Sequence, residues 1–388
     1  MKRIKVGLLS ALFLVFLTSC LTDETKDNQV ENQVLCLQTN PNSNKSDSIQ
    51  HMLTKVVNDG KAPGLIAAII SSDSVIAIAS AGERKTGSGI AFTTNDLVHL
   101  GSCTKAMTST MITTLVAEGK LNWESKLIDV IPEIKGSIHA DYYNITLWQL
   151  LTHRAGLSKN AMDWDVHEHK EIIERRLTIL KDNLQKPATY KYGEFHYSNL
   201  GYMVATCMAE KVTGICWESL MQERLFDPLG MSSTGFGAPN THNQIDQPWG
   251  HKNTWYWYKW VSDQYDNPEA LAPAGMVHCS IVDWAKFLSL QLSKENPILE
   301  RKYLNKLIEP DGNYAGGWGI IEQPWTKGVV LVHNGSNGVW YAEVVVAPKL
   351  DRAFIVATNS CDFGSTPAIC NKIIKKLIRM ELNLLVSE

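Results

Sequence analysis

This 388-residue chain is organised around the stretch His99-Leu100-Gly101-Ser102-Cys103-Thr104-Lys105. An apolar run, Ala106 to Val116, follows it and predicts that Ser102 lies at the start of a helix. Ser102 and Lys105 are three positions apart, so their side chains would share one helix face. The backbone N–H groups of a first helical turn lack partners within the helix. A serine at that place, with a lysine to take its proton, is typical of an activated nucleophile. The alternative is an ordinary helix N-cap.

The beginning of the chain is typical of a bacterial lipoprotein signal. Basic residues precede an apolar run, Val6 to Leu17, of about a dozen residues, too short to span a bilayer with ease. Small residues then precede Cys20, whose sulfur we expect to be lipidated; an ordinary secretory signal is the alternative. We therefore predict a signal peptide at 1–19 and a flexible polar tether at 20–46. The protein would be a membrane-anchored lipoprotein of the cell envelope, facing the periplasm or the surface.

Charge and cysteine usage limit the partners. The net charge is −3, and no basic block indicates a nucleic-acid partner. The cysteines other than Cys20 lack the spacing of metal ligands, so we expect mostly free buried thiols and neither a metal nor an organic cofactor. Cys207 with Cys216, or Cys361 with Cys370, could pair in an oxidising compartment. Spacing leaves that pairing open, and the oligomeric state is unknown.

Strand-like runs lie at both ends of the body, and helical periodicity fills the middle. Short links between the runs favour antiparallel pairing. We expect an α+β fold over 47–388, in which an antiparallel β-sheet from both ends is flanked by N- and C-terminal helices and carries an inserted, mainly α-helical lobe at about 106–280. The predicted strands are 65–70, 75–81, 329–332, 339–347 and 352–358, and the predicted covering helices are 46–58 and 366–385.

Two further motifs follow the nucleophile. Tyr197-x-Asn199 begins at a predicted loop-to-helix junction, where a phenol and an amide could face one cleft, and a phenol near a lysine can relay a proton. His333-Asn334-Gly335 ends a predicted strand, where a glycine lets a substrate lie against the backbone. Both patterns recur elsewhere in the chain, so neither is specific by itself.

Taken in order, Ser102-x-x-Lys105, Tyr197-x-Asn199 and His333-x-Gly335 resemble the motifs of the serine β-lactamase and penicillin-binding protein superfamily. The branch that looks closest contains class C β-lactamases, serine DD-peptidases and related esterases. The resemblance covers about residues 49–385 and implies the β-lactamase/DD-peptidase-like fold.

The resemblance also implies a mechanism. Ser102 would attack a peptide, ester or β-lactam carbonyl and form an acyl-enzyme, while Lys105 and Tyr197 share the proton transfers. Asn199 would hold the substrate amide, and the backbone N–H groups of Ser102 and Ser336 would form the oxyanion hole. The implied partner is a small-molecule or peptide substrate.

His333 departs from the class C pattern, which has a lysine at this position. A lysine is a fixed cation that attracts a substrate carboxylate, whereas histidine is mostly neutral near pH 7. The histidine favours a DD-peptidase or esterase over an efficient β-lactamase. A second interpretation is a slow-turnover penicillin-binding sensor that keeps the fold.

Other residues near the motifs have structural interpretations. Cys103 would point about 100° away from Ser102, and His153 is predicted to be a structural hydrogen-bonding histidine. Aromatic residues crowd 249–260, where a hydrophobic lid and an aromatic wall for a sugar or aromatic acyl group are both open.

Overall fold

The computed structural model describes residues 37–39, 41–254, 259–326 and 328–382. The predicted signal peptide, Cys20 and most of the predicted tether lie outside the described residues, as do residues 255–258 of the aromatic segment. Within the described part of the chain, no helix is both long and apolar enough to cross a membrane.

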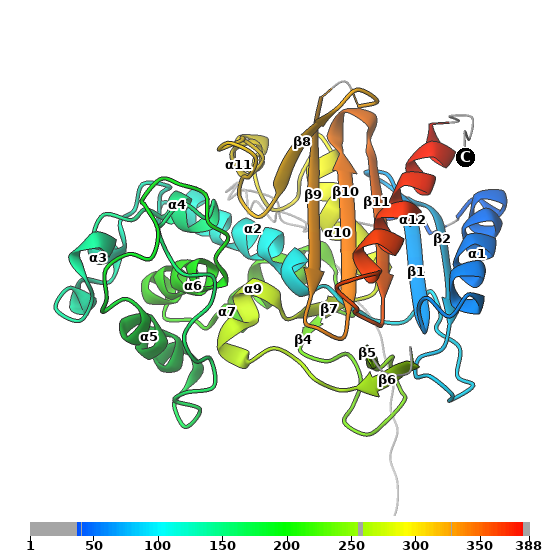
Figure 1. The fold of residues 1–388 in the computed structure, drawn as a ribbon. Coiled ribbons are helices and arrows are strands. Elements are labelled where there is room, and N and C mark those ends of the chain that lie inside the picture. Colours follow the sequence, from blue (N-terminus) through cyan, green and yellow to red (C-terminus); the bar gives the residue numbers. More distant parts are fainter. Residues whose placement is uncertain (1–36, 40, 255–258, 327, 383–388) are drawn as a thin grey trace, which may run out of the picture. The chain divides into compact units, whose positions relative to one another are not determined.

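An antiparallel six-stranded sheet lies at the centre of the fold (Figure 1), in the order β2-β1-β11-β10-β9-β8. The two ends of the body meet where β1 pairs with β11. The predicted antiparallel sheet is therefore confirmed, but β8 was missed because only two of its residues are apolar. The strands are β1 (Gly64–Ile70), β2 (Val75–Gly82), β8 (Gly319–Gln323), β9 (Gly328–Ser336), β10 (Tyr341–Ala347) and β11 (Arg352–Thr358).

Both faces of this sheet are covered. Every residue of β1 and β10 is buried, as continuous apolar strand sequences require when successive side chains point to opposite faces. Helices α1 (Ser43–Asn58) and α12 (Thr366–Glu381) cover one face (Figure 1). The other face packs against α2 (Thr104–Ala117) and α10 (Ile281–Leu292).

The first helix begins earlier than predicted. Helix α1 starts at Ser43, because the side chain of Asn42 accepts a hydrogen bond from the N–H of Lys45 and caps the helix. Before it, Gln38 forms a bridge with Ser74. The segment predicted as a tether, 20–46, therefore contains the start of the first helix.

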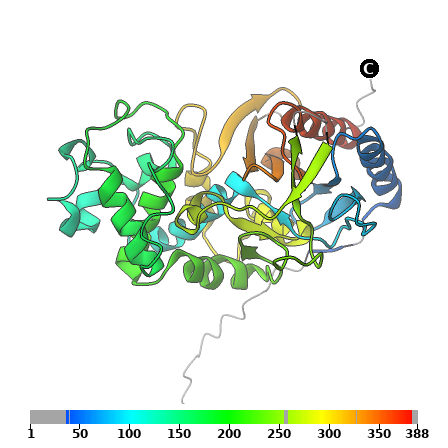
Figure 2. The same cartoon turned by 60° about the horizontal axis from the view of Figure 1, so that its bottom comes forward.

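The chain between β2 and β8 is mainly helical and lies beside the sheet in Figure 2. Helix α2 buries nearly its whole circumference, which is typical of a helix inside a core. Thr146 and Gln149 form the capping box of α4. The other helices are α3 (Leu127–Val130), α4 (Leu147–Leu151), α5 (Ile172–Asn183), α6 (Asn199–Thr213), α7 (Trp217–Met221), α8 (Asp227–Leu229), α9 (Ala272–Gly275) and α11 (Arg301–Leu307).

Two small sheets accompany these helices. The first joins β3 (Val98–His99), β7 (Val277–Cys279) and β4 (Gly235–Phe236). The second pairs β5 (Gly250–Thr254) with β6 (Lys259–Asp263) on either side of residues 255–258. Every cysteine that the structure describes is a free thiol, so neither of the two pairs left open by spacing forms a disulfide.

Arg176 of α5 joins three helices from a fully buried position. Its guanidinium lies 2.6 Å from the carboxylate of Glu210 in α6 and 2.5 Å from that of Glu218 in α7. Burial raises the pKa of Glu210, and the attraction of Arg176 opposes that rise. The arginine therefore compensates a carboxylate that would otherwise be costly inside the lobe.

Replacing Arg176 by methionine should destabilise the protein by about 3–5 kcal/mol, because a buried carboxylate is left without its partner. The measurement is the urea midpoint of unfolding. The control is Lys211→Met, because Lys211 and its partner Glu133 are 43% and 41% exposed, and such pairs contribute at most about 1 kcal/mol. Equal losses in the two variants would contradict this role for Arg176.

Candidate active site

Ser102 lies in a single 3-10 turn, Gly101–Cys103, that leads directly into α2. The predicted position at a helix start is therefore observed, with a tighter first turn than an α-helix. The serine is partly exposed, whereas Cys103 is buried. The serine and not the cysteine is therefore accessible to a substrate, and burial raises the pKa of the Cys103 thiol.

Lys105 is fully buried one turn after the serine. Its Nζ lies 3.2 Å from Ser102 Oγ, 2.7 Å from Asn199 Oδ1 and 2.7 Å from the carbonyl oxygen of Ala274. Burial lowers the pKa of Lys105 well below its usual value, so the amine is stabilised in its neutral form.

A neutral amine has two N–H donors and one lone pair. The carbonyl oxygen of Ala274 can only accept a hydrogen bond. The atom of Asn199 that faces Lys105 is also an acceptor, because the amide nitrogen of Asn199 points the other way and donates to Asn160 Oδ1 at 2.7 Å. Both N–H groups of Lys105 are thereby used. The lone pair remains for the hydroxyl of Ser102, which is the arrangement of a general base.

Tyr197 lies at the junction before α6, as predicted, with its ring centroid 4.8 Å from Lys105 Nζ. Desolvation raises the pKa of this half-buried phenol, and a hydrogen bond with Ser102 opposes the rise. The phenol therefore keeps its proton at neutral pH and is placed to donate it.

His153 positions the loop that carries Tyr197. Its backbone oxygen accepts from the N–H of His196 at 2.8 Å, and its Nδ1 accepts from the N–H of Ser198 at 3.1 Å. The imidazole and the Tyr197 ring lie 4.4 Å apart. Burial lowers the pKa of His153 well below its usual value, which keeps Nδ1 free to accept. This geometry fits the predicted structural role.

The end of β9 presents a free edge to the serine. β8 pairs with β9 only from Gly328 to Val332, whereas β10 pairs as far as Ser336. The backbone there is tightly packed: a Cβ on Gly335 would lie 2.4 Å from Ser102 N, and one on Gly101 would lie 2.2 Å from Ser336 N. The N–H groups of Ser102 and Ser336 therefore belong to two backbones in close contact.

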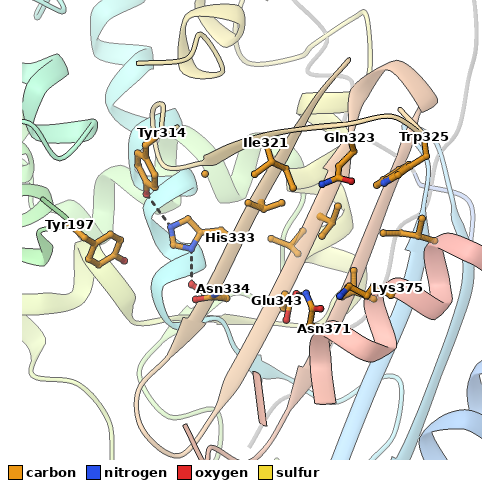
Figure 3. Close-up of a pocket in the computed structure, with 16 residues that line it drawn as sticks. Tyr197, Tyr314, Ile321, Gln323, Trp325, His333, Asn334, Glu343, Asn371 and Lys375 are labelled. Atoms are coloured by element: carbon orange, nitrogen blue, oxygen red, sulfur yellow. Dashed lines mark hydrogen bonds between the residues drawn. The ribbon is translucent and has the colours of Figure 1, made fainter. Parts of the chain in front are cut away.

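His333 is a neutral residue in the same site (Figure 3). Its Nδ1 donates to the carbonyl of Asn334 at 2.7 Å, and its Nε2 accepts from the hydroxyl of Tyr314 at 3.1 Å. Burial lowers the pKa of His333 to about 3. The lysine position of the class C pattern thus carries no charge at neutral pH.

The structure brings together all seven predicted residues of the body: Ser102, Lys105, Tyr197, Asn199, His333, Gly335 and Ser336. Sequence reasoning missed Tyr314 and Asn160, which fix His333 and Asn199 through hydrogen bonds. The only sequence feature that could have indicated Tyr314 is the pair of glycines, Gly316 and Gly317, that follows it. A Cβ on Gly317 would lie 2.5 Å from Ala106 Cα, so this segment packs against the start of α2. Nothing in the sequence singles out Asn160.

A family model described as "Beta-lactamase" matches residues 49–375, so the chain belongs to the β-lactamase family. It is a β-lactamase-like serine hydrolase, as its resemblance to the superfamily implied. Curated relatives share modest identity. One is "Penicillin-binding protein 4" of Amycolatopsis lactamdurans, 28% identical over 76% of this chain and 81% of that protein.

Another relative is "Unguisins hydrolase ungD'" of Aspergillus campestris, 24% identical over 74% of this chain. The chain spans 57% of that protein's length. Among solved structures, the D-amino acid amidase of Ochrobactrum anthropi SV3, complexed with L-phenylalanine amide, superposes with a TM-score of 0.72 at 20% identity, over 88% of this chain and 99% of that chain. This likeness shows the shared fold.

Gly335→Ala should lower kcat about a hundredfold, because its Cβ would separate two backbones that carry the proposed oxyanion donors. The measurement is kcat for ester hydrolysis. Gly136→Ala is the matched control, because a Cβ there meets nothing within 4 Å, and it should leave kcat unchanged. Full activity of Gly335→Ala would show that this contact does not serve catalysis.

His153→Phe should slow acylation of Ser102 about tenfold, because the N–H of Ser198 loses its acceptor and Tyr197 is no longer held. His153→Asn should recover part of the rate, since asparagine supplies an acceptor and tolerates the positive φ of 61° at this position. Single-turnover acylation is the measurement. Equal rates in the two variants would refute the positioning role.

Proposed function

We propose that this serine hydrolase forms an acyl-enzyme on Ser102 and is a DD-peptidase, amidase or esterase in preference to an efficient β-lactamase. The observation that carries the proposal is the buried amine of Lys105, which lies 3.2 Å from Ser102 Oγ while two other acceptors use its N–H groups. A neutral base beside a serine is the requirement for nucleophilic attack at neutral pH.

Acylation follows from these contacts. The Ser102 proton moves to Lys105 Nζ as Oγ bonds to the substrate carbonyl carbon. The developing oxyanion accepts hydrogen bonds from the N–H groups of Ser102 and Ser336, and each such donor contributes roughly 3–4 kcal/mol of transition-state stabilisation.

Release of the leaving group needs the same proton. Tyr197 donates its phenolic proton to the leaving nitrogen or oxygen and recovers one from Lys105, so the bond to the acyl carbon breaks without forming a free anion. Water then attacks the ester of Ser102 by the reverse proton path. Asn199 accepts from Lys105 through its oxygen and donates one amide N–H to Asn160, so its second amide N–H remains for the substrate.

The neutral His333 supports the preference among substrates. A penicillin or cephalosporin carries a carboxylate, and a site without a fixed cation at this position attracts it weakly. Amides and esters need no such cation. The solved amidase with the same fold was complexed with an amino-acid amide.

The segment before the body supports a further part of the proposal. Residues 1–19 would be removed as a signal peptide, Cys20 would carry lipid, and the following polar residues would tether a hydrolase domain to the cell envelope. This part of the proposal rests on the small residues that directly precede Cys20.

Ser102→Ala should abolish labelling by a fluorophosphonate probe. Lys105→Arg should abolish nearly all labelling, because a guanidinium does not lose its proton in proteins and cannot act as the base. Cys103→Ala is the neighbouring control and should label normally. Intact-mass analysis after p-nitrophenyl acetate, a D-Ala-D-Ala peptide and nitrocefin follows the acyl group.

Rapid loss of an acyl adduct from Ser102 is expected for a hydrolase. An adduct that persists would favour a slow-turnover penicillin-binding sensor instead. Unchanged labelling of Ser102→Ala would remove the serine from its proposed role.

A further inference from the structure

A pocket of about 490 Å³ extends the site across β9 toward α12 (Figure 3). At one end it is lined by Tyr197, Tyr314 and His333, and at the other by residues of α12. Neither Ser102 nor Lys105 lines it. The pocket therefore adjoins the proposed proton donor and lies beyond the nucleophile.

The leaving group of a substrate would face this pocket. Under the proposed function, on which this inference rests, Tyr197 gives its proton to the leaving group, so that group must lie against the Tyr197 end. Asn334 is exposed and lines the pocket, while its neighbours His333 and Gly335 are buried. Of the β9 residues that line the pocket, Val332, His333 and Asn334, only Asn334 is exposed.

The pocket holds a carboxylate that the proposed mechanism does not use. Glu343 of β10 is the cross-strand partner of Asn334 and is 9% exposed. Its two oxygens lie 3.3 Å from Asn371 Nδ2 and 3.5 Å from the hydroxyl of Tyr341. Both contacts are longer than the roughly 2.7–2.9 Å of good hydrogen bonds to a charged group.

No strong cation compensates this carboxylate. Burial raises the pKa of Glu343, and the attraction of Lys375 opposes that rise only as a smaller effect. Lys375 is exposed at the rim, and within the described residues no ion pair of 4 Å or less joins the two. His333, the other titratable nitrogen of the pocket, is neutral. The one cation among the lining residues is therefore the exposed Lys375, which is not paired with Glu343.

The remaining walls suit an alkyl chain that ends in a cation. Ile321, Trp325 and Ile374 contribute apolar surface, and an indole ring attracts quaternary ammonium groups. We propose that this pocket receives the leaving group of the substrate and that Glu343 selects leaving groups carrying a cationic amine over those that end in a carboxylate.

Three thioacetates with one acyl group test this inference. Their thiol leaving groups carry a trimethylammonium, an uncharged tert-butyl or a carboxylate at the end of two- or four-methylene tails, and released thiol is measured for all. The expected order of kcat/KM is cation above neutral above anion, about tenfold at each step.

Glu343→Gln has nearly the same size and keeps an acceptor for Asn371, so it should bring the cationic and neutral thioacetates within twofold. Lys375→Met is the matched charge control and should keep or increase the preference for the cation. The uncharged tert-butyl thioacetate is the internal reference, and its kcat/KM should change less between the wild type and Glu343→Gln than that of the cationic thioacetate.

A measurement on the wild type alone tests the inference even if the Glu343→Gln variant fails to fold. Choline should inhibit p-nitrophenyl acetate hydrolysis more strongly than its uncharged analogue 3,3-dimethylbutanol. Equal inhibition, an absent cation preference in the wild type, or a preference retained in Glu343→Gln would overturn the inference. Absence of any acetyl adduct on Ser102 would instead overturn the proposed function beneath it.

Discussion

The catalytic arrangement depends on how one buried nitrogen distributes its hydrogen bonds. Lys105 sits where water cannot solvate a charge, so it is held neutral and has two protons to donate and one lone pair. Acceptors from α6 and α9 use both protons. The serine is left facing the lone pair, so its activation follows from burial and from the donor count together.

This constraint explains why a helical lobe and a sheet must meet at the nucleophile. Asn199 and Ala274 come from the helical part of the chain, while Gly335 and Ser336 come from the sheet. The turn that carries Ser102 lies between them and touches both. Catalysis thus needs two folded regions in contact, and one apolar cluster runs from the helices onto a face of the sheet.

Much of this was predictable from the sequence because it rests on local patterns. The period-two and continuous apolar runs marked five of the six strands of the large sheet, and helix caps such as Thr146 marked helix starts. The ordered motifs located the nucleophile, its base, the phenol and the end of β9. The partners that set their chemistry were not predictable, because Tyr314, Asn160 and Glu343 act through contacts that depend on tertiary packing. Strand β8 escaped for a related reason: its pairing with β9, rather than its own composition, makes it a strand.

The short reach of β8 has a consequence of its own. An unpaired strand end normally invites association with another chain, yet here it is the surface along which an extended substrate backbone could add as one more strand. Two or three more paired residues before Gly319, at the start of β8, would carry the pairing past Val332 and fill that edge. The point at which β8 begins would then control access to the site, and an earlier start would inactivate the enzyme while every catalytic side chain remained in place.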